Sequence, residues 1–158
     1  IEEQLEILSA ALRRLGEQGP QPEVLDRIES VGRYLDEEMA THHRKEEEAL
    51  FPFLMEFLDA EDLHIDGRIA DHEDLKIMSG KFKETLDDCR QRTDGPGGRF
   101  AAQMLRGYGL YIVHLVLEHL LKEDQILFLV AEHYLSCEQE SKILSRFAAI
   151  ENPQVGPV

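Results

Sequence analysis

Two short motifs in the sequence place a histidine four residues before a glutamate. His42 precedes Glu46, and His119 precedes Glu123. Because residues i and i+4 lie on one face of an α-helix, each pair presents an imidazole and a carboxylate to the same point. Imidazole nitrogens and carboxylate oxygens are together typical ligands of transition metals. The spacing therefore predicts that the two pairs bind one or two cations.

A third histidine, His72, interrupts another apolar helical stripe between the two motifs. Taken alone, such a histidine is more often a hydrogen-bonded core residue than a metal ligand. Polar residues on three inward stripes are harder to explain as hydrogen-bonded core residues, because a buried, unpaired carboxylate or imidazole costs on the order of several kcal/mol. A divalent cation removes that cost. We therefore expect five metal ligands: His42, Glu46, His72, His119 and Glu123.

The elements that must position these residues are helices. Apolar residues recur at spacings of three and four over four segments, and no strand-like alternation is found. The helices are expected at residues 1–15, about 23–51, 65–89 and about 105–130, with a short fifth helix near 137–150. Segments rich in Gly, Pro and Asp separate them, at residues 16–22, 59–67 and 93–98. The fold class is therefore expected to be all-α.

The helical spacing also assigns side chains to the core. Proline cannot supply the next backbone donor, so Pro52 should end or kink the second helix. Phe53 should still follow its inward stripe. On the third helix Ile69 should face inward, and on the last helix Ile143, Leu144 and Phe147 should do so.

Size and charge limit the classes of function. With 158 residues, 42% of them hydrophobic, the chain can form one domain with its own core, expected at residues 1–152 and followed by a disordered tail, 153–158. The formal net charge of −15 repels phosphate and anionic lipid, so neither nucleic acid nor a membrane is an expected partner. The acidic first residues do not resemble a signal peptide, and we expect a cytoplasmic protein.

The motifs resemble those of a known family. HHRKEEEALFP at residues 42–52 resembles the HHxKEExxLFP box of hemerythrin-like (HHE cation-binding) domains, and HLLKEDQILF at 119–128 resembles their second box. DHE at 71–73 and FAAIE at 147–151 resemble the segments between and after the boxes, so the resemblance covers nearly the whole chain. It implies an up-down four-helix bundle with a short fifth helix.

The resemblance also implies an iron site, di-iron or mononuclear, bridged by carboxylates and reacting with O2, NO or peroxide. Manganese and zinc also fit the ligand types. The doubled residues of the first box leave two registers, His42 with Glu46 or His43 with Glu47. Periodicity favours the first, since His43 and Glu47 continue a polar stripe and should be outer-shell or surface residues. Asp124, turned about 100° from the His119 face, is a weaker candidate than Glu123.

One position departs from the family pattern. Gln4 stands where the family usually has a histidine, and a neutral amide is a poor ligand for a transition metal. One iron position is thus expected to be weakened or completed by water. The numbering begins at Ile1 and not at a methionine, so upstream residues are expected, and a histidine among them is a less favoured alternative.

The helix that carries the second motif has a further apolar stripe, which includes His114. We expect it to be buried under the last helix or at a homodimer contact, with His114 packed and hydrogen-bonded. Tyr108 and Tyr111 precede His119 by two to three turns and are expected either as outer-shell donors or as core residues. Both cysteines lack CxxC spacing and are expected to be simple thiols.

Three functions remain open at this level. The favoured one is an iron protein that binds O2, NO or peroxide for storage, detoxification or sensing. The second keeps the site and makes it an oxidase or a peroxide-consuming enzyme. The third is a helical interaction module whose polar seam fixes the helix register.

Overall fold

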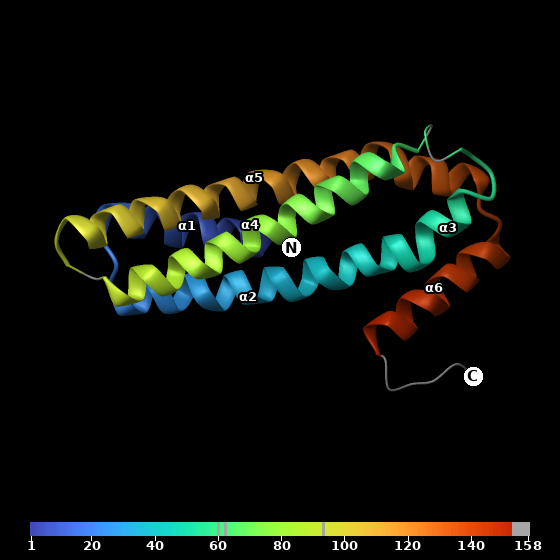
Figure 1. Ribbon diagram of the computed structural model, residues 1–158. Coiled ribbons are helices and arrows are strands. Elements are labelled where there is room, and N and C mark those ends of the chain that lie inside the picture. The colour runs from blue at the N-terminus through green and yellow to red at the C-terminus, as the bar shows by residue number, and fades with distance from the viewer. Residues whose placement is uncertain (60, 62, 93, 153–158) are drawn as a thin grey trace. The chain divides into compact units, whose positions relative to one another are not determined.

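The computed structural model describes residues 1–59, 61, 63–92 and 94–152, with the side chains of these residues except 124–132. All regular secondary structure in these residues is helical (Figure 1). The elements are α1 (Glu2–Gln18), α2 (Pro22–Lys45), the π-helical turn η1 (Glu46–Leu50), α3 (Phe51–Leu54), α4 (Ile65–Gln91), α5 (Gly95–Tyr134) and α6 (Cys137–Glu151). The predicted all-α class is confirmed. The predicted tail at 153–158 lies outside the described residues.

The helices are divided between two compact units. The first unit, Ile1–Glu37 and Glu73–Glu118, contains α1, the first part of α2, the second part of α4 and the first part of α5. Short connections make consecutive helices antiparallel neighbours, as in an up-down four-helix arrangement. The predicted apolar stripes form the core of this unit, which includes Leu5, Leu8, Leu12, Leu15, Ile28, Val31, Phe82, Leu86, Leu105 and Ile112.

Two glycines allow close packing in the first unit. A Cβ atom at Gly109 would lie 2.6 Å from Leu12 Cδ1, and one at Gly32 would lie 2.8 Å from Phe82 Cε1. Both distances are shorter than van der Waals contact between two carbon atoms. A side chain at either position would force the Leu12 or Phe82 side chain to move, so glycine favours this close packing.

The second unit, Glu38–His72 and His119–Val158, contains the remaining parts of α2, α4 and α5 together with η1, α3 and α6. Its apolar cluster consists of Leu50, Phe51, Leu54, Leu63, Ile65 and Ile143. Phe53 and Phe147 pack against this cluster and are partly buried. Only Ile143 on α6 is buried, whereas Leu144, predicted to face inward, is exposed. The short α6 therefore presents a narrow apolar face.

The π-helical turn at Glu46–Leu50 changes the register of the second predicted helix. The Phe51 N–H donates to the Glu46 carbonyl, five residues back, so both of these side chains are buried. The helix continues past Pro52 to Leu54, three residues beyond the predicted end. Proline leaves the Glu48 carbonyl without its usual α-helical donor, and Arg146 of α6 approaches that oxygen at 3.5 Å. The wider turn and this contact explain why the proline does not end the helix.

On α4 the inward face differs from the predicted stripe by one residue. Ile69 is exposed, and Arg68 is buried instead. The Arg68 guanidinium donates to the carbonyls of Leu63 and Lys122. Ile65, Arg68 and His72 follow a spacing of three and four, so the sequence pattern was compatible with this face, but a charged residue was not expected on it.

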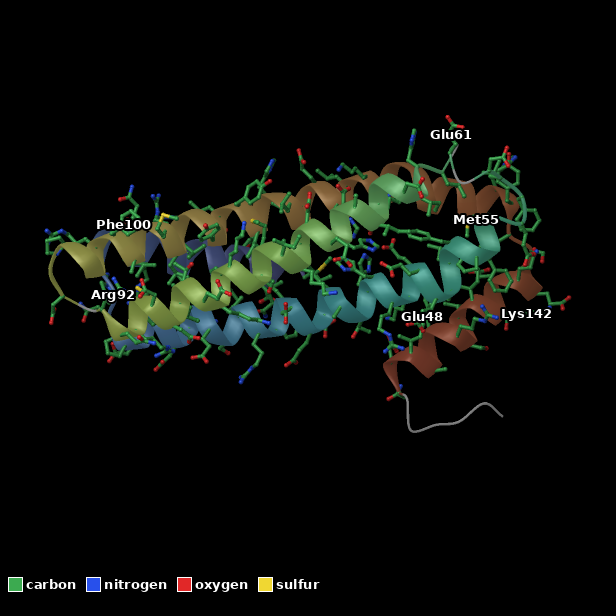
Figure 2. The ribbon with its side chains drawn as sticks, in the orientation of Figure 1. Glu48, Met55, Glu61, Arg92, Phe100 and Lys142 are labelled. Carbon is green, nitrogen blue, oxygen red and sulfur yellow. The ribbon has the colours of Figure 1, made fainter. Side chains whose placement is uncertain are left out.

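Helix α5 begins inside the segment 93–98, which was predicted to separate two helices. α5 starts at Gly95, and Pro96 lies in its first turn, where a missing N–H leaves no intrahelical bond unmade. Its stripe Leu110, Leu117 and Leu121 is exposed in the single chain, and so is Phe100 (Figure 2), so the prediction that the stripe is buried within the chain is wrong. The alternative, a homodimer contact, stays a prediction. Gly95–Glu123 is long and apolar enough to cross a membrane, although core helices have the same composition.

Candidate metal centre

All five predicted ligands lie in the second unit. His42 is in the last turn of α2, and Glu46 begins η1. His72 comes from α4, and His119 and Glu123 come from α5. Glu46, His72, His119 and Glu123 are buried, and the His42 side chain is 25% exposed. Polar side chains from three helices therefore converge inside an otherwise apolar unit.

Four of these residues form a group with two carboxylates. The donor atoms of His42, Glu46, His119 and Glu123 lie within 4.8 Å of one another. His42 Nε2 hydrogen-bonds to Glu123 Oε2 at 2.9 Å, and His119 Nε2 lies 2.6 Å from Glu123 Oε1. Glu46 Oε2 lies 3.9 Å from the Nε2 atoms of both His42 and His119. The spacing of i and i+4 therefore places both motifs as predicted.

His72 is held from two sides by neighbouring glutamates. Its Nδ1 hydrogen-bonds to Glu47 Oε1 at 2.5 Å, and its Nε2 lies 3.1 Å from Glu46 Oε2. The Glu47 side chain is 42% exposed, so it reaches the centre from the surface. A carboxylate on one ring nitrogen fixes the tautomer and turns the other nitrogen toward a metal. Glu47 thus has the geometry of an outer-shell residue, the role that periodicity indicated.

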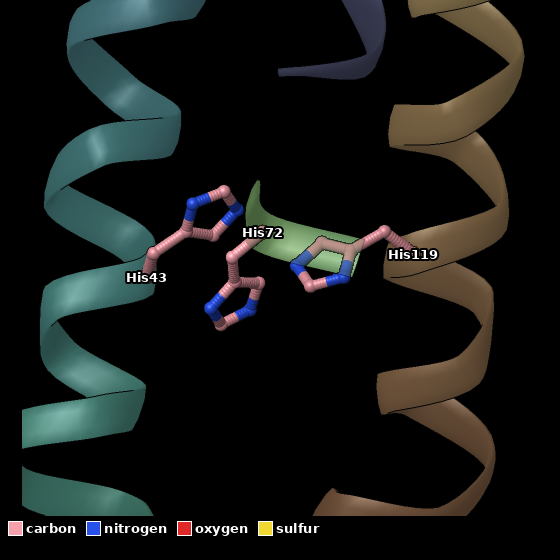
Figure 3. Close-up of side chains that lie close together, drawn as sticks. All are labelled: His43, His72 and His119. Atoms are coloured by element: carbon pink, nitrogen blue, oxygen red, sulfur yellow. The ribbon is translucent and has the colours of Figure 1, made fainter. Parts of the chain in front are cut away.

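His43 lies in the centre and not on a polar surface. Figure 3 shows its ring beside those of His72 and His119. The His43 and His72 rings stack with centroids 3.8 Å apart and planes at 9°, and His119 meets His43 edge-on at 5.1 Å. One donor nitrogen of each of the three lies within 4.8 Å of the others. The prediction that His43 follows a polar, outward stripe is at odds with this placement.

The charges in the centre determine its protonation. Burial would lower the pKa of His42, but hydrogen bonding to Glu123 and its charge raise it above the usual value. Burial would likewise lower the pKa of His72, but hydrogen bonding to Glu46 and Glu47 and their charges raise it above the usual value. For His43, burial and the adjacent positive histidines lower the pKa to about 3. At neutral pH His43 is therefore a neutral imidazole with a free lone pair, the form that binds metals.

Glu123 is an ionised carboxylate over the same range. Burial would raise its pKa, but the close contacts of its carboxylate with His119 and His42 lower it well below the usual value. A buried carboxylate between two imidazoles is the arrangement that a divalent cation neutralises.

The arrangement of the nitrogen and oxygen atoms in the centre suits metal coordination better than hydrogen bonding among themselves. Buried atoms without an aligned hydrogen bond include His43 Nε2, Glu46 Oε2, His72 Nε2, both ring nitrogens of His119 and Glu123 Oε1. Two ligands bound about 2.1 Å from one ion lie about 3.0 Å apart in octahedral and about 3.4 Å apart in tetrahedral geometry. The measured separations, 2.6 to 3.9 Å, bracket these values. The residues present therefore fit a bound cation.

The remaining candidates, apart from Asp124, belong to the first unit. Gln4 is partly buried on α1, and Tyr108 is partly buried on α5, both in the first unit. Tyr111 is exposed, and His114, 61% exposed, pairs with Glu118 at 3.6 Å. Neither is a core residue of the single chain, so the prediction that His114 packs within the chain is wrong. The side chain of Asp124 lies outside the described residues.

Two residues of the second unit were missed or undervalued by sequence reasoning. The HH doublet was a signal for His43, but α-helical periodicity removed it from the inward face. Arg68 had a weaker signal, its position four residues before His72 on the same face of α4. Its Nη1 is buried and has no hydrogen-bond partner.

Comparison with known proteins supports the motif-based interpretation. The model of one family, the hemerythrin HHE cation binding domain, matches residues 1–131. Comparisons with curated proteins and with solved structures give no significant match. The matched residues include both His/Glu motifs and His72, and thus every group of candidate metal ligands. The chain belongs to the hemerythrin HHE cation-binding domain family.

Proposed function

We propose that the centre binds non-haem iron and that the bound iron binds O2, NO or peroxide, in storage, detoxification or sensing. The observation that carries this proposal is the set of buried donor atoms that lack aligned hydrogen bonds. Leaving several such atoms without a partner in a core costs on the order of several kcal/mol. A bound cation would offset that cost, so metal binding is expected to stabilise the folded protein.

The donor set favours iron. Two carboxylates, Glu46 and Glu123, supply hard oxygen ligands, and the imidazoles supply borderline nitrogen ligands. Iron accepts both kinds and would supply open coordination positions and a redox change. We propose one or two iron ions, which Glu46 would help to hold, since its Oε2 lies 3.1 Å from His72 Nε2 and 3.9 Å from His119 Nε2. Manganese and zinc are competing metals on ligand type.

The protein's own residues would position and shield the ion. Glu123 holds His42, and Glu47 holds His72, so two imidazoles are oriented before metal arrives. Burial of His119 and Glu123 excludes bulk water on the side of α5. The partly exposed His42 leaves an edge of the centre near the surface.

The test is anaerobic loading of the purified chain with Fe(II). We expect about one or two iron ions per chain, and near-ultraviolet charge-transfer bands after addition of air or azide. His119→Ala should abolish stoichiometric binding because it removes a ligand from every group. His114→Ala is the matched control, since that histidine is exposed on the same helix.

The outcome separates the three functions. Many peroxide molecules consumed per iron would establish the catalytic alternative, and a single stoichiometric oxidation favours binding or sensing. Absence of bound iron, with no change in thermal stability on adding Fe(II), would reject both metal functions. The interaction module would then remain, with the polar seam fixing helix register.

A further inference from the structure

We propose that His43 is a metal ligand and that, with His72 and His119, it forms a three-imidazole position beside the carboxylate-bearing group. The proposal rests on the proposed metal-binding function and names a ligand that the two H-x-x-x-E motifs do not contain. The three-imidazole position would bind a borderline divalent cation such as Fe(II) or Zn(II).

The first argument concerns His72. The five motif-derived ligands do not form one group, because the carboxylate-bearing group comprises His42, Glu46, His119 and Glu123. The described residues place His72 in a group of at least three convergent donors only together with His43 and His119. Glu47 already occupies His72 Nδ1, which leaves Nε2 as the donor. If His72 binds a metal with two other imidazoles, His43 is one of them.

The second argument concerns the nitrogen atoms of His43. A histidine that only fills space in a core donates or accepts hydrogen bonds, and buried polar atoms without them are rare. His43 Nε2 is buried and has no partner. Its ring stacks on His72 and meets His119 edge-on, so it faces the two other ligands and not an apolar wall (Figure 3).

The donor chemistry sets the class of ion. Three imidazoles bind zinc, iron, copper or nickel in preference to magnesium or calcium. Three protein nitrogens leave a tetrahedral ion one open position for water or a small ligand. His119 belongs to both groups, so the two positions are adjacent and compete for it.

The test uses Zn(II), which is redox-inert, and the full chain. Binding is measured by competition with a chromophoric chelator for the unmodified protein, His43→Gln, and the control His114→Gln. We expect His43→Gln to lower the Zn(II) affinity of the three-imidazole position by more than about 100-fold, since loss of even an outer-shell residue costs about 10- to 100-fold. The group of His42, Glu46, His119 and Glu123 keeps all its ligands in this variant. The control should bind like the unmodified protein, because His114 is exposed and pairs only with Glu118 among the described contacts.

A second comparison isolates the three-imidazole position. Glu123→Gln removes a carboxylate from the other group and leaves His43, His72 and His119 in place. We expect Glu123→Gln to retain bound Zn(II), and the double variant with His43→Gln to lose it. Equal binding by these two variants overturns the proposal.

A measurement on the unmodified chain guards against variants that fail to fold. With 15N-labelled histidine, addition of Zn(II) should shift a ring-nitrogen resonance of His43. An unmoved resonance, with Zn(II) bound, overturns the proposal and leaves the proposed function intact. Failure of the unmodified chain to bind either Zn(II) or Fe(II) rejects both.

Discussion

Adjacent glutamates in the first motif have different roles at the residue scale. Glu46 is buried and directs Oε2 toward three histidines, whereas Glu47 is partly exposed and accepts a hydrogen bond from His72 Nδ1. Glu48, the third in the run, is exposed (Figure 2) and pairs with Arg44. One helical turn thus supplies a candidate ligand, a residue that orients a ligand, and a solvent-exposed ion pair.

Replacing Glu47 by Gln should weaken metal binding without removing a ligand. The amide is a weaker acceptor than the carboxylate, so it fixes the His72 ring less firmly and lowers the basicity of Nε2. We expect Zn(II) affinity to fall by about 10- to 100-fold, measured by chelator competition. Glu48→Gln is the matched control and should leave the affinity unchanged. Equal affinities for the two variants would show that Glu47 does not position His72.

The placement of individual residues depended on what the helical pattern could resolve. His42, Glu46, His119 and Glu123 were predicted from a spacing of four and do come together. His43 was placed outward by the same periodicity, yet its ring lies among the others. A histidine side chain is long enough to reach across part of a helix face, so direction at Cβ does not determine where the ring nitrogens lie.

At the scale of elements, the last helix is defined by its cap and one buried residue. Ser136 caps α6 by accepting from the Gln139 N–H, and the Gln139 side chain accepts from the Ser136 N–H. This capping box satisfies donors that the first turn would leave unpaired. Lys45 of α2 forms an ion pair with Glu151 at the other end of α6.

Removal of the cap should destabilise the protein. We expect Ser136→Ala to lower the free energy of unfolding by about 1 kcal/mol, because the first turn of α6 loses its side-chain acceptor. Urea denaturation followed by circular dichroism measures the change. Ser145→Ala is the control: among the described contacts its hydroxyl donates to the Ser141 carbonyl within the helix, and its effect should stay below about 0.5 kcal/mol. A larger effect at Ser145 than at Ser136 would contradict the assigned role of the cap.

The positions where helices begin and end depended on the local context of single prolines more than on the number of Gly and Pro residues in a segment. Pro52 was expected to interrupt a helix, and the π-helical turn before it carries the chain through to Leu54. Pro96, in a segment expected to be a loop, lies in the first turn of α5. Proline is compatible with a first turn, so composition alone overestimated both interruptions.

At the scale of the whole molecule, metal binding and folding are expected to be coupled. The candidate ligands come from distant parts of the sequence, so the unfolded chain does not hold them together. A ligand that binds only the native state at 100 times its Kd stabilises by about 2.7 kcal/mol. For a chain of this size that corresponds to a rise in Tm of roughly 5 to 11 °C.

Thermal unfolding with and without Fe(II), under anaerobic conditions, measures this stabilisation. Mg(II) at the same concentration is the control and should have no effect, because imidazoles are poor ligands for it. A chelator should reverse the rise in Tm. An equal rise with Mg(II) would indicate a general charge effect on this acidic chain and not occupation of the centre.

The sequence by itself determined the all-α class, the apolar stripes of the first unit and the two His/Glu pairs, because helical periodicity and i to i+4 spacing are local properties of the chain. Only the tertiary structure decided which donors share a group. His72 comes from a separate helix and meets His43 through packing, and the exposure of the α5 leucines depends on which neighbours cover them. Long-range packing therefore places the His43 ring among the other histidines, although periodicity had assigned this residue to a polar stripe as an outer-shell or surface residue.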